Sequence, residues 1–556
     1  MADLDGDVEV DVLVVGAGPV GLTAALLLER FGLSVAVVER RDGPSRAPAA
    51  HAVNARTFEI WRQIGLDVDA IRAEAQDPAD AGMVHWVRKL GGEVIASLPY
   101  ERQGDEQLAV TPTPLRNLSQ HRLEPMLVEA LAAAGVPVHY GHQWESADLD
   151  RAATTEGVTS SVAGPSGTAT VASRWLLACD GASSPVRRRL GIVPEGPHRI
   201  QSFVMVHVAA DLRPLVGDEP GVLFWICDAA TGGTFVSHGV DREWVYMHAY
   251  DPDTESAESY TPERCEALVR AALEDPAVPF EVVTVATWTM TAQVAPRFRD
   301  GRVLLVGDAA HRFPPTGGLG LNTGVADAHN LAWKLAAVER GTADAGLLDS
   351  YERERRPVAQ RNAAVSLENA LKIIEVPIAL GADPDPVVFQ ANIDATLADP
   401  EGRARVVAAI ERQAPHFDLI GLQLGYAYDL DGGAGAVGAP GTAGDDGSAD
   451  DGRAYVPSSR PGGRLPHGWV RRAGTTCSTL DLIPLDHPML IAGPTCTAVD
   501  ADLRMGVDID DPDGWWSTTL GLPDDGALLV RPDQHIAARW TSTPAAAEVE
   551  RARRAS

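Results

Sequence analysis

The 556-residue sequence has few cysteines, only three lysines, and no long apolar run. Its five cysteines are widely scattered, with no CxxC pair and no metal-ligand spacing, which argues against a disulfide framework, a metal site and a redox dithiol. No apolar stretch approaches the ~20 residues that a membrane-spanning helix needs. The formal net charge of −30 disfavours nucleic acid and anionic membrane surfaces as partners.

The N-terminal segment MADLDGDVEV is acidic and lacks the apolar core of a secretory signal. Together with the scattered cysteines, this predicts a cytoplasmic protein with reduced thiols and no membrane partner. The sequence leaves the oligomeric state open, a homo-oligomer included.

The segment Asp11 to Arg40, DVLVVGAGPVGLTAALLLERFGLSVAVVER, has the pattern of a βαβ unit. An apolar strand ends at Gly16, a helix follows Gly21, and a second apolar strand ends at Glu39. Gly16, Gly18 and Gly21 form GxGxxG, which allows a tight turn and the close approach of a pyrophosphate to a helix N-terminus. Glu39 stands where an acidic residue holds a ribose hydroxyl. The alternative, a plain tight turn, does not explain the acidic residue at this spacing.

A second GxGxxG occurs at residues 433–438, as GAGAVG. No apolar strand precedes it, and a Gly/Asp-rich stretch follows where a helix should begin. We therefore do not expect a nucleotide site there, because the pattern needs its strand and helix.

Two more segments complete the pattern: CDGASSPVRRRLGI at 179–192 and GRVLLVGDAAHRFPPTGGLGLNTGVADAHNLAWKL at 301–335. With the first segment, they resemble the DG and GD motifs of the group A flavoprotein monooxygenases, the aromatic hydroxylases built like para-hydroxybenzoate hydroxylase. HAVNARTFEIW at 51–61 and HFDLIGLQLGYAY at 416–428 are most similar to the phenol and chlorophenol hydroxylase branch, whose relatives also modify aromatic polyketides. The resemblance implies FAD as cofactor, with NAD(P)H and O2 as co-substrates.

The resemblance also implies the residues that contact FAD, with Asp308 on the ribityl hydroxyls and the N–H groups of Leu321 and Asn322 near the reduced ring. Arg46 could equally be a solvated loop residue, and Gln120 a helix-cap or surface residue. The complete set of expected cofactor-binding residues is Gly16, Gly18, Gly21, Glu39, Arg46, Gln120, Asp180, Gly181, Asp308, Pro315, Gly320, Leu321 and Asn322.

The predicted architecture is an α/β fold in which an FAD-binding βαβ domain is interleaved with an antiparallel substrate sheet. Residues 1–194 form the first part of the FAD-binding domain, and period-two alternation predicts the sheet at 195–295. Residues 296–430 return to the FAD-binding domain and add helices. A flexible Gly/Asp-rich insertion is expected at 431–454, and a thioredoxin-like domain without redox cysteines at 455–556.

We therefore expect a monooxygenase that hydroxylates a phenolic or polycyclic aromatic substrate through a flavin C4a-hydroperoxide. A Baeyer–Villiger or ring-modifying oxygenase acting on an aromatic polyketide shares this scaffold and is the alternative. His51 occupies the place of an acidic residue that contacts the substrate hydroxyl in the phenol hydroxylase branch. It is either the base that accepts the phenol proton or a structural hydrogen-bonding residue. Tyr246 and His248 of the sheet are the other catalytic candidates, with His207 as a further one.

Overall fold

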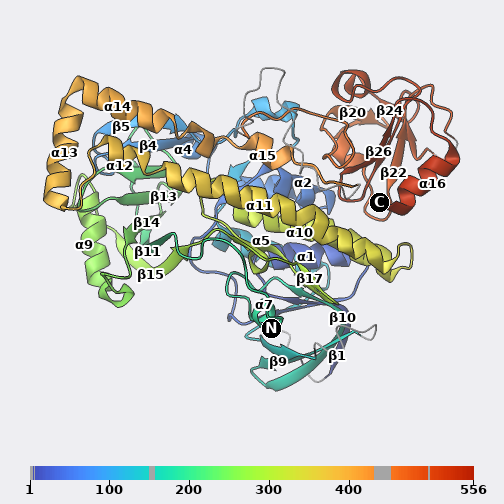
Figure 1. The fold of residues 1–556 in the computed structure, drawn as a ribbon, viewed down its shortest axis with the longest axis horizontal. Helices are drawn as coiled ribbons and strands as arrows, with labels where there is room; N and C mark the ends of the chain where they lie inside the picture. The colour runs from blue at the N-terminus through green and yellow to red at the C-terminus, as the bar shows by residue number, and fades with distance from the viewer. Residues whose placement is uncertain (1–3, 5–6, 149–156, 431–451, 499–500, 556) are drawn as a thin grey trace.

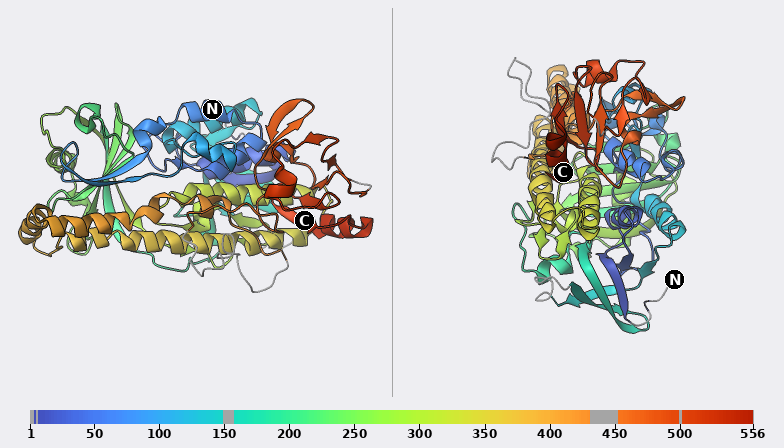
Figure 2. Two further views of the ribbon diagram at one scale, coloured as in Figure 1. Left: turned by 90° about the horizontal axis from the view of Figure 1, so that it is seen from above. Right: turned by 90° about the vertical axis from the view of Figure 1, so that its right-hand side faces the viewer.

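The computed structural model describes residues 4, 7–148, 157–430, 452–498 and 501–555 (Figure 1). The glycine pattern at 433–438 and almost all of the predicted 431–454 insertion lie outside this part of the chain. A parallel-type sheet lies at the bottom centre of Figure 1, an antiparallel-rich sheet at the left end, and a smaller C-terminal unit at the upper right. The view from above keeps the same order along the long axis (Figure 2).

The first sheet has the strand order β17-β18-β10-β1-β2-β7, with β9 paired to β10 and β8 paired to β9. β1 pairs in parallel with β2 and β10, and β10 pairs in parallel with β18. The return strand from the third motif therefore joins the sheet begun by the first, as predicted. The strands are β1 (Val8–Val15), β2 (Val35–Glu39), β7 (Val138–Tyr140), β8 (Gln143–Ala147), β9 (Val158–Gly164), β10 (Gly167–Ala178), β17 (Arg299–Asp300) and β18 (Val303–Leu305).

Helices pack against this sheet, and its central strands are buried. α1 packs against α10 and α5, and the long α11 runs beside α10 toward the second sheet (Figure 1). The principal helices of this region are α1 (Pro19–Arg30), α2 (Ala55–Gln63), α5 (Gln120–Ala133), α7 (Pro185–Arg189), α10 (Leu319–Glu339) and α11 (Asp349–Lys372).

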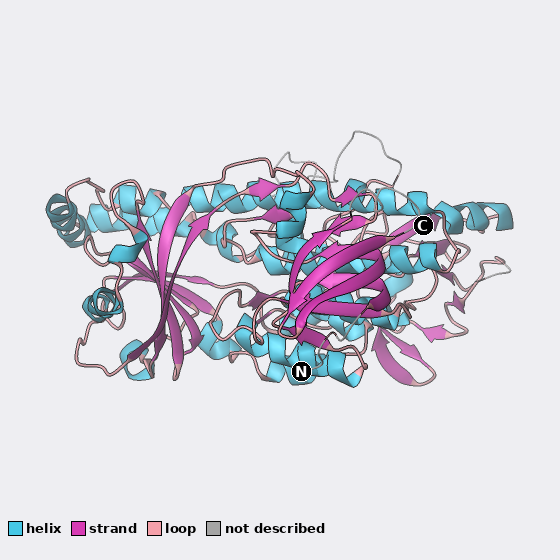
Figure 3. Cartoon of the chain, turned by 90° about the horizontal axis from the view of Figure 1, so that it is seen from below, coloured by secondary structure: helices cyan, strands magenta, loops and turns pink. Residues whose placement is uncertain are grey.

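The second sheet lies at the left of the view in Figure 3. It is seven-stranded, with the order β15-β11-β14-β13-β12-β4-β5. Five of its strands come from the segment 195–295: β11 (Gln201–Ala209), β12 (Leu223–Ile226), β13 (Gly233–Gly239), β14 (Glu243–Tyr250) and β15 (Glu281–Met290). The other two, β4 (Met83–Val87) and β5 (Val94–Pro99), precede that segment and extend the sheet through a parallel β12–β4 pair. The sheet thus contains more of the chain than the alternating pattern indicated.

The two faces of this sheet have different coverings. Phe224, Phe235, Trp244 and Tyr246 pack under α9 (Pro262–Ala272). On the other face, α12 (Glu375–Ala379), α13 (Pro386–Ala398) and α14 (Pro400–Glu411) pack over β4, β5 and β12.

The register shows that Met205, Met247 and Thr234 lie opposite one another on the face away from α9. Phe203 and Trp288 share this face and stack with ring centroids 5.1 Å apart. Apart from the buried Thr234, these side chains are half-buried, whereas Phe224 and Phe235 are buried. Part of this face therefore remains open.

The C-terminal unit contains a four-stranded sheet of order β23-β22-β25-β26, with α16 (Ala546–Ala555) packed on β25 and β26. β22 and β23 are parallel, while β22–β25 and β25–β26 are antiparallel, as in a thioredoxin-like core. Cys477 and Cys496 carry free thiols. The strands of this unit are β20 (Trp469–Arg472), β21 (Thr475–Ser478), β22 (Met489–Ala492), β23 (Leu503–Arg504), β24 (Ile509–Asp510), β25 (Ala527–Val530) and β26 (Ile536–Trp540).

In the part of the chain that the structure describes, no helix combines the length and apolarity needed to cross a bilayer. The same residues contain no group of three or more His, Cys, Asp or Glu side chains placed to hold a metal ion.

Candidate active site

The three motifs meet at the carboxyl edge of the first sheet. Cys179 N–H donates to the Val15 carbonyl at 2.9 Å, and Val306 N–H donates to the Ala178 carbonyl at 3.0 Å. The segments that follow β1, β10 and β18 are therefore neighbours, although they are separated by more than 100 residues in the sequence. The crevice outside the carboxyl ends of such strands is where ligands bind in open α/β sheets.

The three glycines of the first loop have different structural roles. Gly16 has φ +106°, and a Cβ there would lie 2.3 Å from the Cys179 carbonyl oxygen. A Cβ on Gly21 would lie 2.0 Å from the Gly16 carbonyl oxygen. A Cβ on Gly18 would meet nothing within 4 Å. Packing thus requires the first and third glycines, while the second borders open space at the start of α1, which has no side-chain cap.

Glu39 is buried beside this loop and accepts the Ala17 N–H at 2.8 Å. Its other oxygen accepts the Arg41 N–H at 3.0 Å and Arg41 Nε at 3.1 Å. Burial alone would raise the pKa of Glu39, but these hydrogen bonds outweigh it and lower the pKa. The carboxylate is therefore ionised and held at the end of β2.

Arg41 links Glu39 to a second buried carboxylate, Glu124 on α5, at 3.2 Å. Gln120 donates to Glu124 at 2.7 Å, which places the Gln120 side chain in the same cluster. Arg46 lies outside the cluster: its side chain is 81% exposed and pairs with Asp42 at 3.1 Å. Sequence reasoning missed Arg41 and Glu124, and the position of Arg41 two residues after Glu39 was the available signal.

The second motif contains an unpaired buried oxygen. Asp180 Oδ2 accepts the Val186 N–H at 3.1 Å, whereas Oδ1 is buried with no hydrogen-bond partner among the described residues. Burial raises the pKa of Asp180 against the hydrogen bonds from Ser184 and Val186. Gly181 follows with φ +80°. Arg187 is buried and donates to the Ala309 carbonyl at 2.8 Å, so it ties the second motif to the third.

Asp308 is exposed, although its neighbours Gly307 and Ala309 are buried. Desolvation nevertheless raises its pKa, against the opposing charges of His311 and Arg312. The carboxylate therefore reaches an open space that protein largely encloses. Within the described residues, no group hydrogen-bonds to it, and a Cβ on Gly320 would lie 4.0 Å from Asp308 Oδ1.

The start of α10 faces the same space. Gly318 precedes the helix with φ +60°, and no side chain caps the first turn, which contains Gly320 and Leu321. Uncapped N–H groups and the positive end of the helix dipole favour negative charge here. The turn before the helix contains Pro315, whose carbonyl accepts the Gly318 N–H at 3.0 Å.

The Asn322 side chain holds the 52–57 segment against α10. Its oxygen accepts the Asn54 N–H at 3.0 Å and the Thr57 hydroxyl at 2.7 Å, and its nitrogen donates to the Ala52 carbonyl at 2.8 Å. A Cβ on Gly318 would lie 2.7 Å from the Ala52 Cβ. His51, the residue before Ala52, is thereby placed next to the N-terminus of α10.

His51 is half-buried, and its Nδ1 is 3.0 Å from Asn117 Oδ1. Its ring meets His238 edge-on at a centroid distance of 5.3 Å and stacks on Tyr100 at 6.4 Å. Burial lowers the pKa of His51 against the hydrogen bond to Asn117, so the ring is neutral at neutral pH. None of the described residues hydrogen-bonds to its Nε2.

The other candidate bases have structural partners. Tyr246 donates to the Thr231 carbonyl at 2.6 Å, and His248 Nδ1 lies 2.8 Å from the Gly232 carbonyl. Alternation along β14 directs both side chains to the face that α9 covers, away from Met247. His207 pairs with Glu243 at 2.8 Å.

His311 likewise has a structural partner, because it pairs with the buried Asp327 at 2.6 Å.

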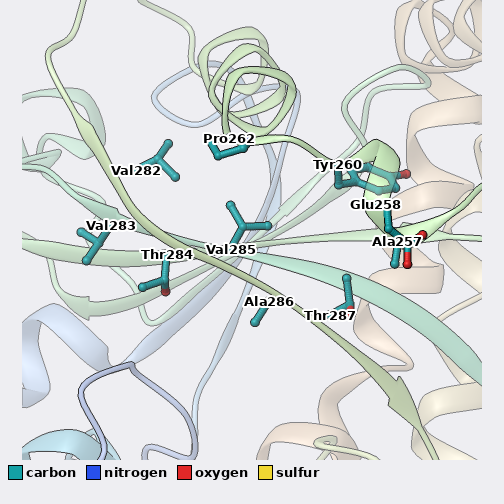
Figure 4. Close-up of a pocket in the computed structure, with 10 residues that line it drawn as sticks. All are labelled: Ala257, Glu258, Tyr260, Pro262, Val282, Val283, Thr284, Val285, Ala286 and Thr287. Carbon is teal, nitrogen blue, oxygen red and sulfur yellow. The ribbon is translucent and has the colours of Figure 1, made fainter.

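A separate cavity of about 520 Å³ lies between β15 and the segment from Ala257 to Pro262 (Figure 4). Its lining includes Tyr260, Val283 and Val285, and it contains none of the motif residues.

Comparison with known proteins gives matches over nearly the whole chain. Residues 9–366 match the FAD binding domain family, and residues 458–555 match the C-terminal domain of aromatic-ring hydroxylases. The chain is 35% identical to aklavinone 12-hydroxylase RdmE of Streptomyces purpurascens, covering 98% of this chain and 97% of the relative. It is 31% identical to 2,4-dichlorophenol 6-monooxygenase of Delftia acidovorans, covering 96% of each.

Among solved structures, the flavin-dependent monooxygenase PieE, in complex with FAD and substrate, matches with a TM-score of 0.87. The identity is 33%, and the match covers 97% of each chain. The three motifs, the interleaved second sheet and these full-length matches lead to one assignment: the chain belongs to the FAD-dependent aromatic-ring hydroxylases.

Proposed function

We propose that this enzyme hydroxylates a phenolic ring and that His51 accepts the phenol proton. The observation that carries the proposal is the position of His51 beside the α10 N-terminus, with Nδ1 bonded to Asn117 and Nε2 without a described partner. Loss of the phenol proton raises electron density at the ring carbons ortho and para to oxygen, where an electrophilic oxygen atom must attack. Burial lowers the pKa of His51, so its imidazole is neutral at neutral pH and its free nitrogen can accept the phenol proton.

The cofactor fits the residues at the sheet edge. The open space beside Gly18 and the uncapped start of α1 suit a pyrophosphate, and Glu39 suits a ribose hydroxyl. Asp308 has the unpaired acceptor atoms that ribityl hydroxyls need. When bound, FAD supplies the activation of O2 with electrons from NAD(P)H.

Further residues are proposed to complete the FAD site. Asp180 and Gly181 border it from β10, and Gln120 borders it through Glu124. On the α10 side, the backbone N–H groups of Gly320, Leu321 and Asn322 lie in the uncapped first turn, and Pro315 contributes close-packed backbone before the helix.

The substrate is proposed to lie on the open face of the second sheet. Phe203, Met205, Met247 and Trp288 give this face a half-buried apolar surface on which a flat aromatic ring can stack. This apolar surface excludes water from around the ring, which limits the loss of activated oxygen as hydrogen peroxide. Both monocyclic phenols and polycyclic phenolic compounds meet these chemical requirements.

This assignment divides the chain into parts with separate tasks. Residues 1–194 and 296–430 hold FAD, residues 195–295 supply most of the substrate floor, and residues 455–556 form the C-terminal domain. β4 and β5 lie in the substrate sheet and are exceptions to these boundaries.

The test is NAD(P)H oxidation by the purified FAD-loaded enzyme with a panel of monocyclic and polycyclic phenols, followed by product mass. Stimulated oxidation and a product that has gained one oxygen with an intact ring support hydroxylation. A ring-expanded lactone would instead indicate Baeyer–Villiger chemistry. His51→Gln should lower the hydroxylation rate by about 10²-fold or more while FAD stays bound, with more hydrogen peroxide released per NAD(P)H.

His248→Gln is the matched control, because His248 is a sheet histidine bonded to a backbone carbonyl on the α9 side. It should retain coupled hydroxylation. Equal coupling in His51→Gln and in the wild-type enzyme would overturn the role of His51.

A further inference from the structure

We propose that Asn117 and Gln103 are positioning residues that fix the protonation pattern of His51, with hydrogen on Nδ1 and the lone pair on Nε2. The inference deepens the proposed function, because it concerns the histidine assigned there as the base. Neither Asn117 nor Gln103 is among the motif residues expected to contact the cofactor or the substrate.

The chain of hydrogen bonds begins at two backbone carbonyls. Gln103 Nε2 is 2.9 Å from the Ala81 carbonyl oxygen and 3.2 Å from the Tyr100 carbonyl oxygen. A carbonyl can only accept, so the side-chain nitrogen of Gln103 must occupy this position and the oxygen must face away. Gln103 is 5% exposed, so water does not compete for these contacts.

This orientation fixes the next amide in turn. Gln103 Oε1 accepts from Asn117 Nδ2 at 3.2 Å, which leaves Asn117 Oδ1 directed at His51 Nδ1, 3.0 Å away. Asn117 is 1% exposed. Because Oδ1 has no proton to donate, the neutral imidazole must carry its hydrogen on Nδ1. Nε2 is then the only ring atom able to accept a proton.

The backbone holds the hydrogen-bonded chain Gln103–Asn117–His51, called the relay below, in register. His51 leads into β3 (Ala52–Val53), which pairs with β6 (Arg116–Asn117), and Leu118 N–H donates to the His51 carbonyl at 2.7 Å. Gln76 N–H donates to the Asn117 carbonyl at 2.9 Å. His51 and Asn117 therefore cannot separate without breaking this two-stranded ribbon.

The relay is electrically neutral along its whole length. The titratable rings in contact with His51 are His238 and Tyr100. Burial lowers the pKa of His238 and raises that of Tyr100, so both are uncharged at neutral pH. A carboxylate in place of Asn117 would keep His51 protonated, whereas an amide leaves it ready to accept.

In the proposed step, the phenol O–H bond breaks and a His51 Nε2–H bond forms. The electron pair stays on the phenolate oxygen, and the imidazolium retains its Nδ1–H bond to Asn117. The relay thus contributes orientation and tautomer and takes no proton itself.

The test is nitrogen NMR of the FAD-loaded enzyme with ring-¹⁵N-labelled histidine, with His51 assigned by its loss in His51→Gln. We expect His51 to show a protonated Nδ1 and an unprotonated Nε2 at pH 7.5. Asn117→Leu and Gln103→Met should each shift His51 toward the Nε2-protonated form, since the first removes the acceptor and the second frees Asn117 to rotate. His142, whose Nδ1 is 2.9 Å from the Tyr140 carbonyl, is the internal control and should stay unchanged.

A second measurement places a negative charge beside His51 and follows the pKa of its ring. Asn117→Asp should raise the pKa of His51 by about 1–3 units in the same spectra. A wild-type His51 protonated on Nε2, or an unchanged tautomer in both neutral variants, would overturn the relay. If Asn117→Leu fails to retain FAD, Gln103→Met still decides the question, because it leaves His51 and its direct partner in place.

Activity measurements distinguish the role of His51 as base from its orientation by Asn117 and Gln103. Both neutral variants should lower hydroxylation by about tenfold or more with FAD binding intact. If the spectra show the relay but His51→Gln hydroxylates normally, the role of His51 as base is wrong and the relay stands. If His51→Gln is impaired but the tautomer is not fixed, only the relay is wrong.

Discussion

Arg464 of the C-terminal region and Glu59 of α2 form an ion pair whose side chains are both completely buried. Arg464 Nε donates to Glu59 Oε2 at 2.8 Å, and Arg56 also pairs with Glu59, at 3.2 Å. Arg56 in turn donates to Gln534, in the turn between β25 and β26, at 2.6 Å. The C-terminal unit is therefore anchored to the helix whose N-cap residue, Asn54, donates its N–H to Asn322 on α10.

Removing one partner of this pair should destabilise the protein strongly. We expect Arg464→Met to cost about 3–5 kcal/mol, because it leaves the Glu59 carboxylate buried with fewer partners. Urea unfolding of the holoenzyme measures the change. Arg62→Gln is the matched control, since Arg62 joins α2 to Asp481 at the surface, and its loss should cost about 1 kcal/mol or less. Equal effects of the two substitutions would contradict the importance of burial.

The first-loop glycines should separate folding from ligand binding. Gly18→Ala meets no protein atom within 4 Å, so the apoprotein should keep its stability while FAD affinity falls. Gly21→Ala places a Cβ 2.0 Å from the Gly16 carbonyl oxygen, so the apoprotein itself should be destabilised. Thermal unfolding of both apoproteins and FAD titration of the soluble ones provide the measurements. Unimpaired FAD binding by Gly18→Ala would argue against a pyrophosphate in that space.

Asp308→Asn should weaken FAD retention because the amide keeps only one of the two carboxyl oxygens that can accept from the ribityl hydroxyls. We expect a loss of about 1.5–3 kcal/mol in binding free energy, or roughly 10- to 100-fold in affinity. Released flavin fluorescence during dilution gives the dissociation constant. Asp300→Asn is the control, because the Asp300 carboxylate on β17 pairs with Arg297 at the surface. A wild-type affinity in Asp308→Asn would remove that residue from the cofactor site.

Glu101 should make the stability of the protein depend on pH. It has φ +49°, and burial raises its pKa to about 7, against hydrogen bonds from Leu419 N–H and Gln423. The folded pKa exceeds the unfolded value of 4.5, so the contribution is complete below pH 4.5 and is lost as pH rises through 7. Relative to Glu101→Gln, the wild-type protein should lose about 3 kcal/mol between those limits. Urea midpoints at pH 5 and pH 8 test this, and parallel pH profiles would contradict it.

The part of the fold that local patterns specify was predictable from sequence. The strand–glycine–helix pattern around Gly16 and the apolar strand before Asp308 each encode a buried parallel strand, and the structure pairs them in one sheet. β4 and β5 were missed because their membership in the second sheet depends on a long-range parallel pair with β12, which leaves no local signal.

The candidate site was predictable only to the level of motifs. Alternation showed that half of the sheet residues face away, but only the register identifies Met205 and Met247 as one face and Tyr246 and His248 as the other. Asn117 and Gln103 gave no sequence signal, because their role arises from amide orientations that are set by two distant carbonyls.

Isotopic labelling shows whether an oxygen atom from O2 is transferred to a phenolic ring. The FAD-loaded enzyme is supplied with NAD(P)H, ¹⁸O2 and the phenol that most stimulates NAD(P)H oxidation, and the mass of the product is measured by mass spectrometry. For each NAD(P)H consumed, we predict one new ¹⁸O-labelled hydroxyl group on an intact aromatic ring. In His51→Gln, a larger share of the NAD(P)H consumed should yield hydrogen peroxide in place of hydroxylated product. A product without ¹⁸O, or oxidation that yields only hydrogen peroxide with every phenol of the panel, would show that the enzyme is not a phenol hydroxylase.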